Sequence, residues 1–286
     1  MSRKTLSVAV LVAVTSAASV PAFASSYAVS INQITNFSMS ATSGSISPFT
    51  FTFSNDAAAL NNVGASNVNS TDAAGACVGS ACSGWQNLFA NHSGVTTGFS
   101  YGDAQILSLP TLSGGLGAAS AIGETRATVG VGYGTGSNAL MASFNVVTAG
   151  TQLHFDFDAN LIMQTILGAG DLGAAASSSM QITINGPSGY QFLWTPNGAT
   201  GGIAGGSEVS DPFSLNQGIG GTSSFSAASS SPGFNASTAG LAAGFYSMNI
   251  TMTQTANVSA VPVPAAAWLL GSGLVGLVAV ARRRTA

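Results

Sequence analysis

The sequence predicts an all-β chain: an antiparallel β-sandwich of jelly-roll type with long loops rich in Gly, Ser and Ala, followed by one C-terminal transmembrane helix. Short runs of residues alternate apolar and polar side chains, as in 49–54 and 245–255. That period of two is typical of half-buried strands. Gly, Ser and Asn separate the runs, and no long amphipathic helix is evident.

The strands are expected in the following order along the chain: 27–39, 49–54, 98–107, 126–133, 140–147, 152–166, 180–185, 190–195, 212–215 and 245–255. Ala149 and Gly150 are expected to join two strands as a hairpin, and 185–189 is expected as a second tight connection. Stretches with weak periodicity are expected as long surface loops: 55–83, 199–206 and 218–243. So many short strands fit a sandwich of jelly-roll type.

Charge is scarce and unevenly distributed. Charged residues make up 5% of the chain, against about 25% in an average soluble domain. Between Ser25 and Pro264 the sequence holds one cation, Arg126, and nine acids, a formal net charge of −8. One cation cannot neutralise a run of phosphates, so this composition argues against a nucleic-acid partner.

The N-terminus has the order of features of a secretory signal peptide. Arg3 and Lys4 precede an apolar run over 6–14, and Ala22 and Ala24 flank Phe23 in the Ala-x-Ala form that signal peptidase accepts. Cleavage there would remove residues 1–24 and leave Ser25 as the new N-terminus. The sequence therefore predicts export.

The two cysteines, Cys77 and Cys82, lie five positions apart in the first expected loop. An exported chain meets an oxidising compartment, which favours a disulfide between them. The alternative is half of a metal site, but no histidine or third cysteine lies nearby.

The C-terminus predicts a membrane-spanning helix. Residues 265–281 carry no charge and would form a helix about 26 Å long, near the lower limit for crossing a bilayer. Trp268 lies where an interfacial aromatic residue belongs, and three adjacent cations would stay in the cytoplasm: Arg282, Arg283 and Arg284. The alternative is a buried core helix, which rarely ends a chain on adjacent cations.

The tail resembles the PEP-CTERM sorting signal over about 25 residues. The resemblance lies in Pro262 and Pro264, in the Gly-punctuated apolar run that begins at Trp268, and in the arginine cluster 282–284. Val263 stands where the family's name implies Glu. Two prolines favour extended backbone, which is the form that a protease cleft binds.

This resemblance implies a location and processing partners. Such tails are recognised by an exosortase in Gram-negative bacteria that make exopolysaccharide and biofilm matrices. The expected organisation is a signal peptide over 1–24, an extracytoplasmic β-rich domain over 25–260 and a sorting tail over 261–286. We expect transient anchoring in the inner membrane, then release to the cell surface or extracellular matrix.

Candidate chemistry in the body is sparse. His154, Asp156 and Asp158 would share one face of a strand and could bind a divalent cation such as Ca²⁺, with Asn160 adding an oxygen. The alternative is the solvent side of a half-buried strand, which explains the same alternation. The glycine-rich run 130–134 has no lysine nearby and is expected as a turn between strands.

No nucleophile elbow or metalloprotease motif occurs, so no catalytic residue and no required cofactor are predicted. Aromatic side chains that could stack on sugars are Trp85, Tyr101, Tyr190 and Trp194. Three functions remain open at this point: a structural surface or matrix protein associated with exopolysaccharide, a carbohydrate-binding module assisted by Ca²⁺ or by ring stacking, and an exported hydrolase.

Overall fold

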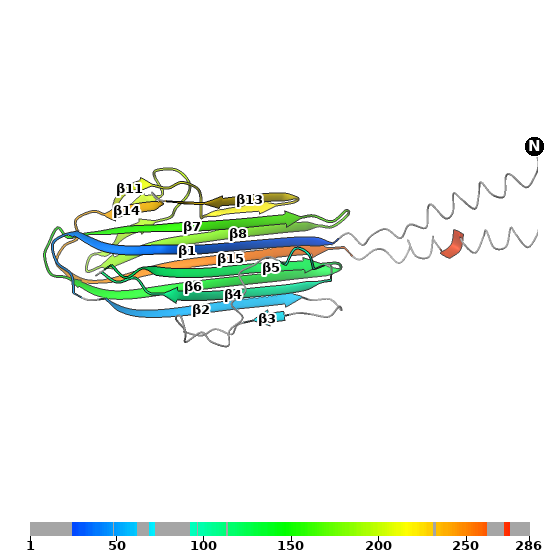
Figure 1. Ribbon diagram of the computed structural model, residues 1–286, viewed down its shortest axis with the longest axis horizontal. Coiled ribbons are helices and arrows are strands. Elements are labelled where there is room, and N and C mark those ends of the chain that lie inside the picture. Colours follow the sequence, from blue (N-terminus) through cyan, green and yellow to red (C-terminus); the bar gives the residue numbers. More distant parts are fainter. Residues whose placement is uncertain are drawn as a thin grey trace, which may run out of the picture. The chain divides into compact units, whose positions relative to one another are not determined.

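A computed structural model describes residues 25–47, 49–61, 69–71, 92–95, 97–112, 114–230, 233–261 and 272–274. The chain divides into two compact units, and the larger comprises Ser25–Pro262. Almost all described residues belong to it. They form two facing β-sheets, as the sequence predicts (Figure 1).

Sheet A has eight strands. Its main path runs β11 (Gly206–Ser210), β14 (Phe234–Thr238), β7 (Gln152–Ile166), β1 (Ser26–Ser43), β5 (Gly117–Ala127), β4 (Phe99–Ser108) and β3 (Asn69–Thr71), and β13 (Ser223–Ala228) also pairs with β7. Every pairing in this sheet is antiparallel except that of β3 with β4.

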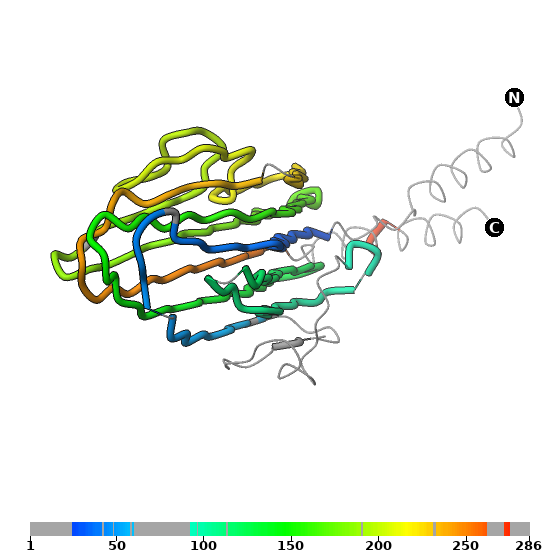
Figure 2. Tube along the Cα trace, turned by 60° about the vertical axis from the view of Figure 1, so that its left-hand side comes forward, coloured from blue at the N-terminus to red at the C-terminus, as the bar shows by residue number. Residues whose placement is uncertain are grey.

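Sheet B has seven strands, all antiparallel. Its path runs β10 (Ile203–Ala204), β9 (Gly189–Trp194), β8 (Gly173–Gly186), β15 (Gly244–Ala260), β6 (Gly130–Val146) and β2 (Thr50–Asn61), and β12 (Gln217–Gly220) also pairs with β8. The first and last strands of the unit, β1 and β15, lie side by side in opposite sheets (Figure 2).

The predicted alternation is confirmed on the long strands. In β7, Leu153, Phe155 and Phe157 are completely buried between the sheets, while His154 and Asp156 face outward. β15 alternates in the same way. Burying one side of each strand removes apolar surface from water, which is the main favourable contribution to folding here.

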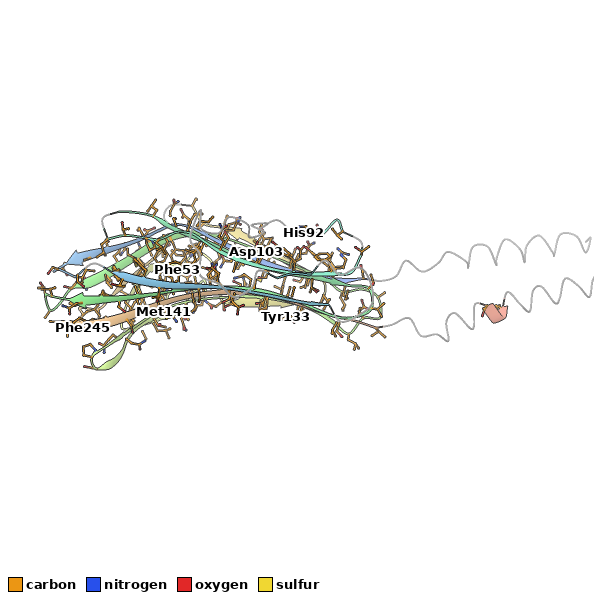
Figure 3. All side chains as sticks on the ribbon, turned by 90° about the horizontal axis from the view of Figure 1, so that it is seen from below. Phe53, His92, Asp103, Tyr133, Met141 and Phe245 are labelled. Atoms are coloured by element: carbon orange, nitrogen blue, oxygen red, sulfur yellow. The ribbon has the colours of Figure 1, made fainter. Side chains whose placement is uncertain are left out.

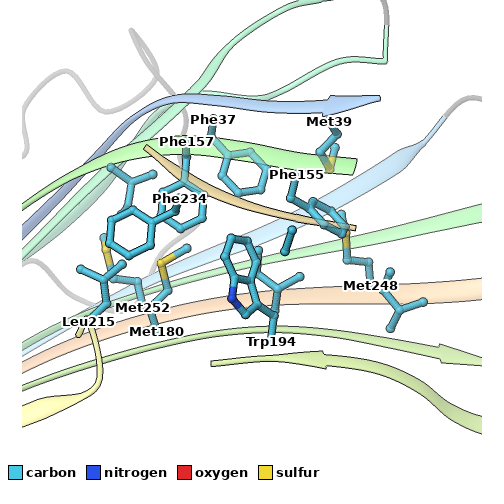
Figure 4. Packing of buried hydrophobic residues seen from close by; sticks show 14 of the residues in the cluster. Phe37, Met39, Phe155, Phe157, Met180, Trp194, Leu215, Phe234, Met248 and Met252 are labelled. Atoms are coloured by element: carbon cyan, nitrogen blue, oxygen red, sulfur yellow. The ribbon is translucent and has the colours of Figure 1, made fainter. Parts of the chain in front are cut away.

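Stacked rings fill one end of the space between the sheets. The ring of Phe157 lies 4.9 Å from that of Phe234 and 5.6 Å from that of Phe37, measured between centroids. Trp194 of β9 packs against Phe157 from the opposite sheet at 5.5 Å (Figure 4). These large side chains hold the sheets apart at this end.

At the other end the sheets approach closely enough for their backbones to touch. A Cβ atom at Gly136 of β6 would lie 2.0 Å from the carbonyl oxygen of Asp103, and one at Gly134 would lie 2.2 Å from that of Tyr101. Only glycine allows this approach. The prediction of a turn over 130–134 is wrong: these residues form the start of strand β6.

Several boundaries predicted from the sequence are wrong. The expected strand 126–133 spans the turn between β5 and β6, and 212–215 forms no strand. The expected loops contain the second half of β2, all of β3, β10, β13 and β14, and most of β12, while most of β11 lies where no element was expected. β13 and β14 both pair with the long strand β7, so their strand structure depends on a partner that is distant in the sequence.

Of the two predicted tight connections, one forms a hairpin and the other does not. Residues 185–189 do join β8 to β9 as a hairpin, with Gly186 opposite Gly189, whose φ of 91° suits glycine. Ala149 and Gly150 do not form a hairpin, because β6 belongs to sheet B and β7 to sheet A. The chain crosses between the sheets at this point.

Among the residues that the structure describes, no helix is long and apolar enough to cross a membrane. The predicted helix over 265–281 lies outside the described residues except for 272–274.

We expect Gly136→Ala to lower the free energy of unfolding by about 3 kcal/mol or to prevent folding, because the added methyl group would overlap backbone atoms of β4. Chemical denaturation measures this loss. The matched control is Gly218→Ala in β12, where a Cβ would meet its nearest atom at 3.6 Å. A control as damaging as Gly136→Ala would contradict the close-packing explanation.

Candidate functional site

The predicted metal-binding side chains lie together on the outer face of β7, held by neighbouring polar groups. The Nδ2 atom of Asn235 donates to His154 Nε2 and to Asp156 Oδ2, both at 3.1 Å. His154 Nε2 is therefore an acceptor, so Nδ1 carries the proton and donates to Ser237 Oγ at 2.9 Å. Asp158 Oδ2 accepts from Asn36 Nδ2 at 2.9 Å.

This arrangement confirms that the three side chains share a face, but it brings no cation-binding cluster together. Within the described ranges, no group of three or more His, Cys, Asp or Glu residues is placed to hold a metal ion. Asn160, the fourth predicted ligand, contacts Gln33 instead, with its Nδ2 atom 3.5 Å from Gln33 Oε1. Calcium binding here stays a prediction that no observation supports.

A cluster that the sequence did not predict lies on the outer face of sheet A. It centres on Glu124 of β5, whose side chain is completely buried. Glu124 Oε1 accepts from the Tyr27 hydroxyl at 2.5 Å and from the backbone N–H of His92 at 2.6 Å. Glu124 Oε2 lies 2.6 Å from His92 Nδ1. Figure 3 shows His92 on this outer side.

Tyr27 and Arg126, which lie beside Glu124, are also buried. Arg126 lies over the Tyr27 ring at 4.8 Å and donates to Ser25 Oγ at 3.0 Å and to the Ser93 carbonyl at 2.8 Å. Burial and the adjacent Glu124 carboxylate raise the pKa of the Tyr27 phenol, while burial lowers the pKa of the Arg126 guanidinium. The cluster fixes the segment 92–95 against the sheet.

The sequence does contain a signal for this cluster, in the residue types of two strands. In β1, residues 26–32 are buried on both faces, and β4 is buried on both faces over 99–106. Tyr27, Phe99 and Tyr101 occupy positions that a half-buried strand would leave exposed. Apolar residues at both parities predict a strand covered on both sides.

A pair of carboxylates organises the loop between β9 and β10. Glu208 Oε1 accepts from Trp194 Nε1 at 2.5 Å, and Glu208 Oε2 accepts from the Gly201 N–H at 3.0 Å. Asp211 Oδ2 accepts from the N–H groups of Asn197 and Gly198 at 2.7 and 2.8 Å. Burial, reinforced by the neighbouring Glu208, raises the pKa of Asp211 to about 6 against the backbone hydrogen bonds.

A third acid joins the two ends of the larger unit. Asp171 Oδ2 accepts from the Ser26 hydroxyl at 2.7 Å, and Asp171 Oδ1 accepts from the backbone N–H of Val261 at 3.0 Å. The Ser26 hydroxyl also accepts from the Gly168 N–H at 3.0 Å. One carboxylate therefore holds both the start of β1 and the residue after β15.

The predicted sugar-stacking residues are mostly not exposed. Trp194 is completely buried and Tyr101 is 3% exposed, so both belong to packed clusters and not to a binding surface. The side chain of Tyr190 and all of Trp85 lie outside the described residues. So do the residues of the predicted processing sites and disulfide: Ala22, Ala24, Cys77, Cys82, Pro262, Pro264, Trp268, Arg282, Arg283 and Arg284.

No family model, curated protein or solved structure matches this chain. The functional argument therefore rests on the sequence and on the geometry above.

We expect His92→Ala to destabilise the protein by about 2 kcal/mol, because it removes a hydrogen bond to the buried Glu124 carboxylate. Chemical denaturation at neutral pH provides the measurement. His154→Ala is the matched control: its imidazole faces outward from β7, so its loss should cost less than about 1 kcal/mol. Equal losses for the two variants would show that the Glu124 cluster does not anchor the segment 92–95.

Asp211 should make stability fall as the pH rises from about 4 to about 6. Its pKa is about 6 in the folded protein against 3.8 for the free side chain, so between these values the folded state binds more protons than the unfolded state. Well below pH 4 and well above pH 6 this contribution is constant.

The test is to compare Asp211→Asn with the unaltered chain by denaturation at pH 4, 5, 6 and 7. An amide oxygen still accepts the two backbone hydrogen bonds but carries no charge. We expect the variant to become progressively more stable relative to the unaltered protein across this range. Two parallel pH profiles would refute the expectation.

Proposed function

We propose that this chain is an exported, non-catalytic structural protein of a Gram-negative cell surface or extracellular matrix. A signal peptide over 1–24 starts its export, and the PEP-CTERM-type tail over 261–286 holds it transiently in the inner membrane until an exosortase processes it. In this proposal the β-rich body is displayed in association with exopolysaccharide.

The observation that carries the proposal is that Asp171 forms hydrogen bonds to both ends of the β-rich body. Signal peptidase would cut before Ser25, and the exosortase would act near Pro262 and Pro264. The compact unit begins at Ser25, and its last strand ends at Ala260. The hydrogen bonds from Ser26 and Val261 to Asp171 close the body just inside both expected processing points. Removing both ends would therefore break none of the strands that the structure describes.

Two finer features belong to this proposal. We take the sandwich to be of jelly-roll type, and we take 265–281 to be the membrane-spanning helix that presents the proline pair to the exosortase. The hydrogen-bonded state of the acids in the described body also favours a structural role. Glu124, Asp171 and Glu208 each accept two or more hydrogen bonds that hold the chain in place.

The test is to express the full chain in an exopolysaccharide-producing Gram-negative host with and without its exosortase. Intact mass and cell fractionation report the outcome. With the exosortase, we expect a protein that begins at Ser25, lacks the arginine cluster and is found at the cell surface or in the matrix. Without it, we expect the tail to be retained and the protein to stay in the inner membrane.

A double variant, Pro262→Ala with Pro264→Ala, should retain the tail even when the exosortase is present, because the extended segment is lost. Pro187→Ala, in the β8–β9 hairpin, is the matched control and should be processed normally. Recovery of a cytosolic protein with both termini intact would overturn the proposed function.

A further inference from the structure

The outer face of sheet B is regular and nearly uncharged. β15 pairs with β6 over its whole length without a register shift, and its pairing with β8 is also continuous. Outward side chains on such strands stand in rows, about 6.8 Å apart along each strand and about 4.8 Å apart between strands. Within β2, β6, β8 and β15 the one charged residue is Asp56.

A depression of about 430 Å³ lies on this face, near the start of β6. Tyr133 of β6, Asn257 of β15 and Ala175 of β8 form one row across the three strands. Val131, Ser259 and Gly173 form the next row. The small residues of β8 leave open space beside the Tyr133 ring, and the volume is in the range of small-molecule sites, about 300–1,000 Å³.

The polar groups in this depression are not used by the fold. No hydrogen bond joins the side chain of Tyr133 or Asn257 to any described residue. Further along the same strands, the outward hydroxyls bond to one another: Ser137 with Thr253 at 3.1 Å, and Ser177 with Thr255 at 2.5 Å. The depression therefore presents a ring face, an amide and a hydroxyl that remain available to a ligand.

We propose that this depression binds an uncharged sugar ring of a polysaccharide, with Tyr133 as the stacking surface and Asn257 and Ser259 as the hydrogen-bonding groups. The inference deepens the proposed function and rests on the exported location given there. An aromatic ring matches the apolar face of a pyranose, and an amide donates to and accepts from its hydroxyls. The lining residues carry no charge, which favours a neutral glycan over an acidic one.

The site lies on the side of the molecule opposite the Glu124 cluster. Figure 3 shows Tyr133 and Met141 on one outer side and His92 on the other. Met141 is on the same strand and face as Tyr133, is 49% exposed and does not line the depression. It therefore provides a matched control for substitutions at Tyr133.

The experiment measures binding of the purified full chain to neutral hexasaccharides (cellohexaose, maltohexaose and xylohexaose) by isothermal titration calorimetry, with hexagalacturonate as the acidic comparison. We expect at least one neutral ligand to bind, with little dependence on salt. Tyr133→Ala should weaken that binding at least about tenfold, and Asn257→Ala should also weaken it. Tyr133→Phe keeps the ring and should stay within about threefold of the unaltered chain, as should Met141→Ala.

The site assignment fails if no neutral hexasaccharide binds, if the acidic one binds best, or if Tyr133→Ala binds as well as Met141→Ala. Because Tyr133 is only partly buried, circular dichroism should show that each variant remains folded. Intact mass and cell fractionation measure export and tail processing independently of glycan binding. A protein that is exported and processed but binds no glycan overturns this inference alone, whereas a cytosolic protein with intact ends overturns the proposed function.

Discussion

The close approach of the two sheets at the glycines of β6 is the constraint on which the rest of the structure depends. Gly134 and Gly136 bring the backbone of sheet B against the carbonyl oxygens of β4. A side-chain hydrogen bond joins the sheets here, from the Ser30 hydroxyl of β1 to Gln254 Oε1 of β15 at 2.6 Å. Within sheet B, Gln254 Nε2 donates to Ser178 Oγ at 3.0 Å. Rings can separate the sheets only at the opposite end, around Phe157.

The small separation of the sheets at one end explains why the buried ionisable groups of sheet A lie on its outer face. Since the space between the sheets near Gly134 has little room for large side chains, Tyr27, Tyr101 and Glu124 lie on the outer face of sheet A and are buried there. The outer face of sheet B carries many short hydroxyl and amide side chains instead, with Tyr133 and Met141 among them. The sandwich therefore has one face organised around a buried carboxylate and another that is regular and nearly uncharged.

The proposed sorting function and the proposed glycan site depend on different parts of the sandwich. Asp171 binds both Ser26 and Val261, so the sorting signals would act on segments outside the described strands. The depression at Tyr133 belongs to the neutral face, on strands whose register is fixed over many residues. A site carried by long paired strands is held more rigidly than one on a loop.

The sequence by itself determined the two-sheet class and the alternation of β7 and β15, because a period of two depends only on local order. It also determined that His154, Asp156 and Asp158 share a face. It did not determine that Trp194 and Tyr101 are buried or that β10 to β14 are strands. It also left open the pairing of His92 with Glu124. Those outcomes depend on which distant segment covers each face and edge, and the tertiary structure decides this, since burial and strand pairing join residues far apart in the chain.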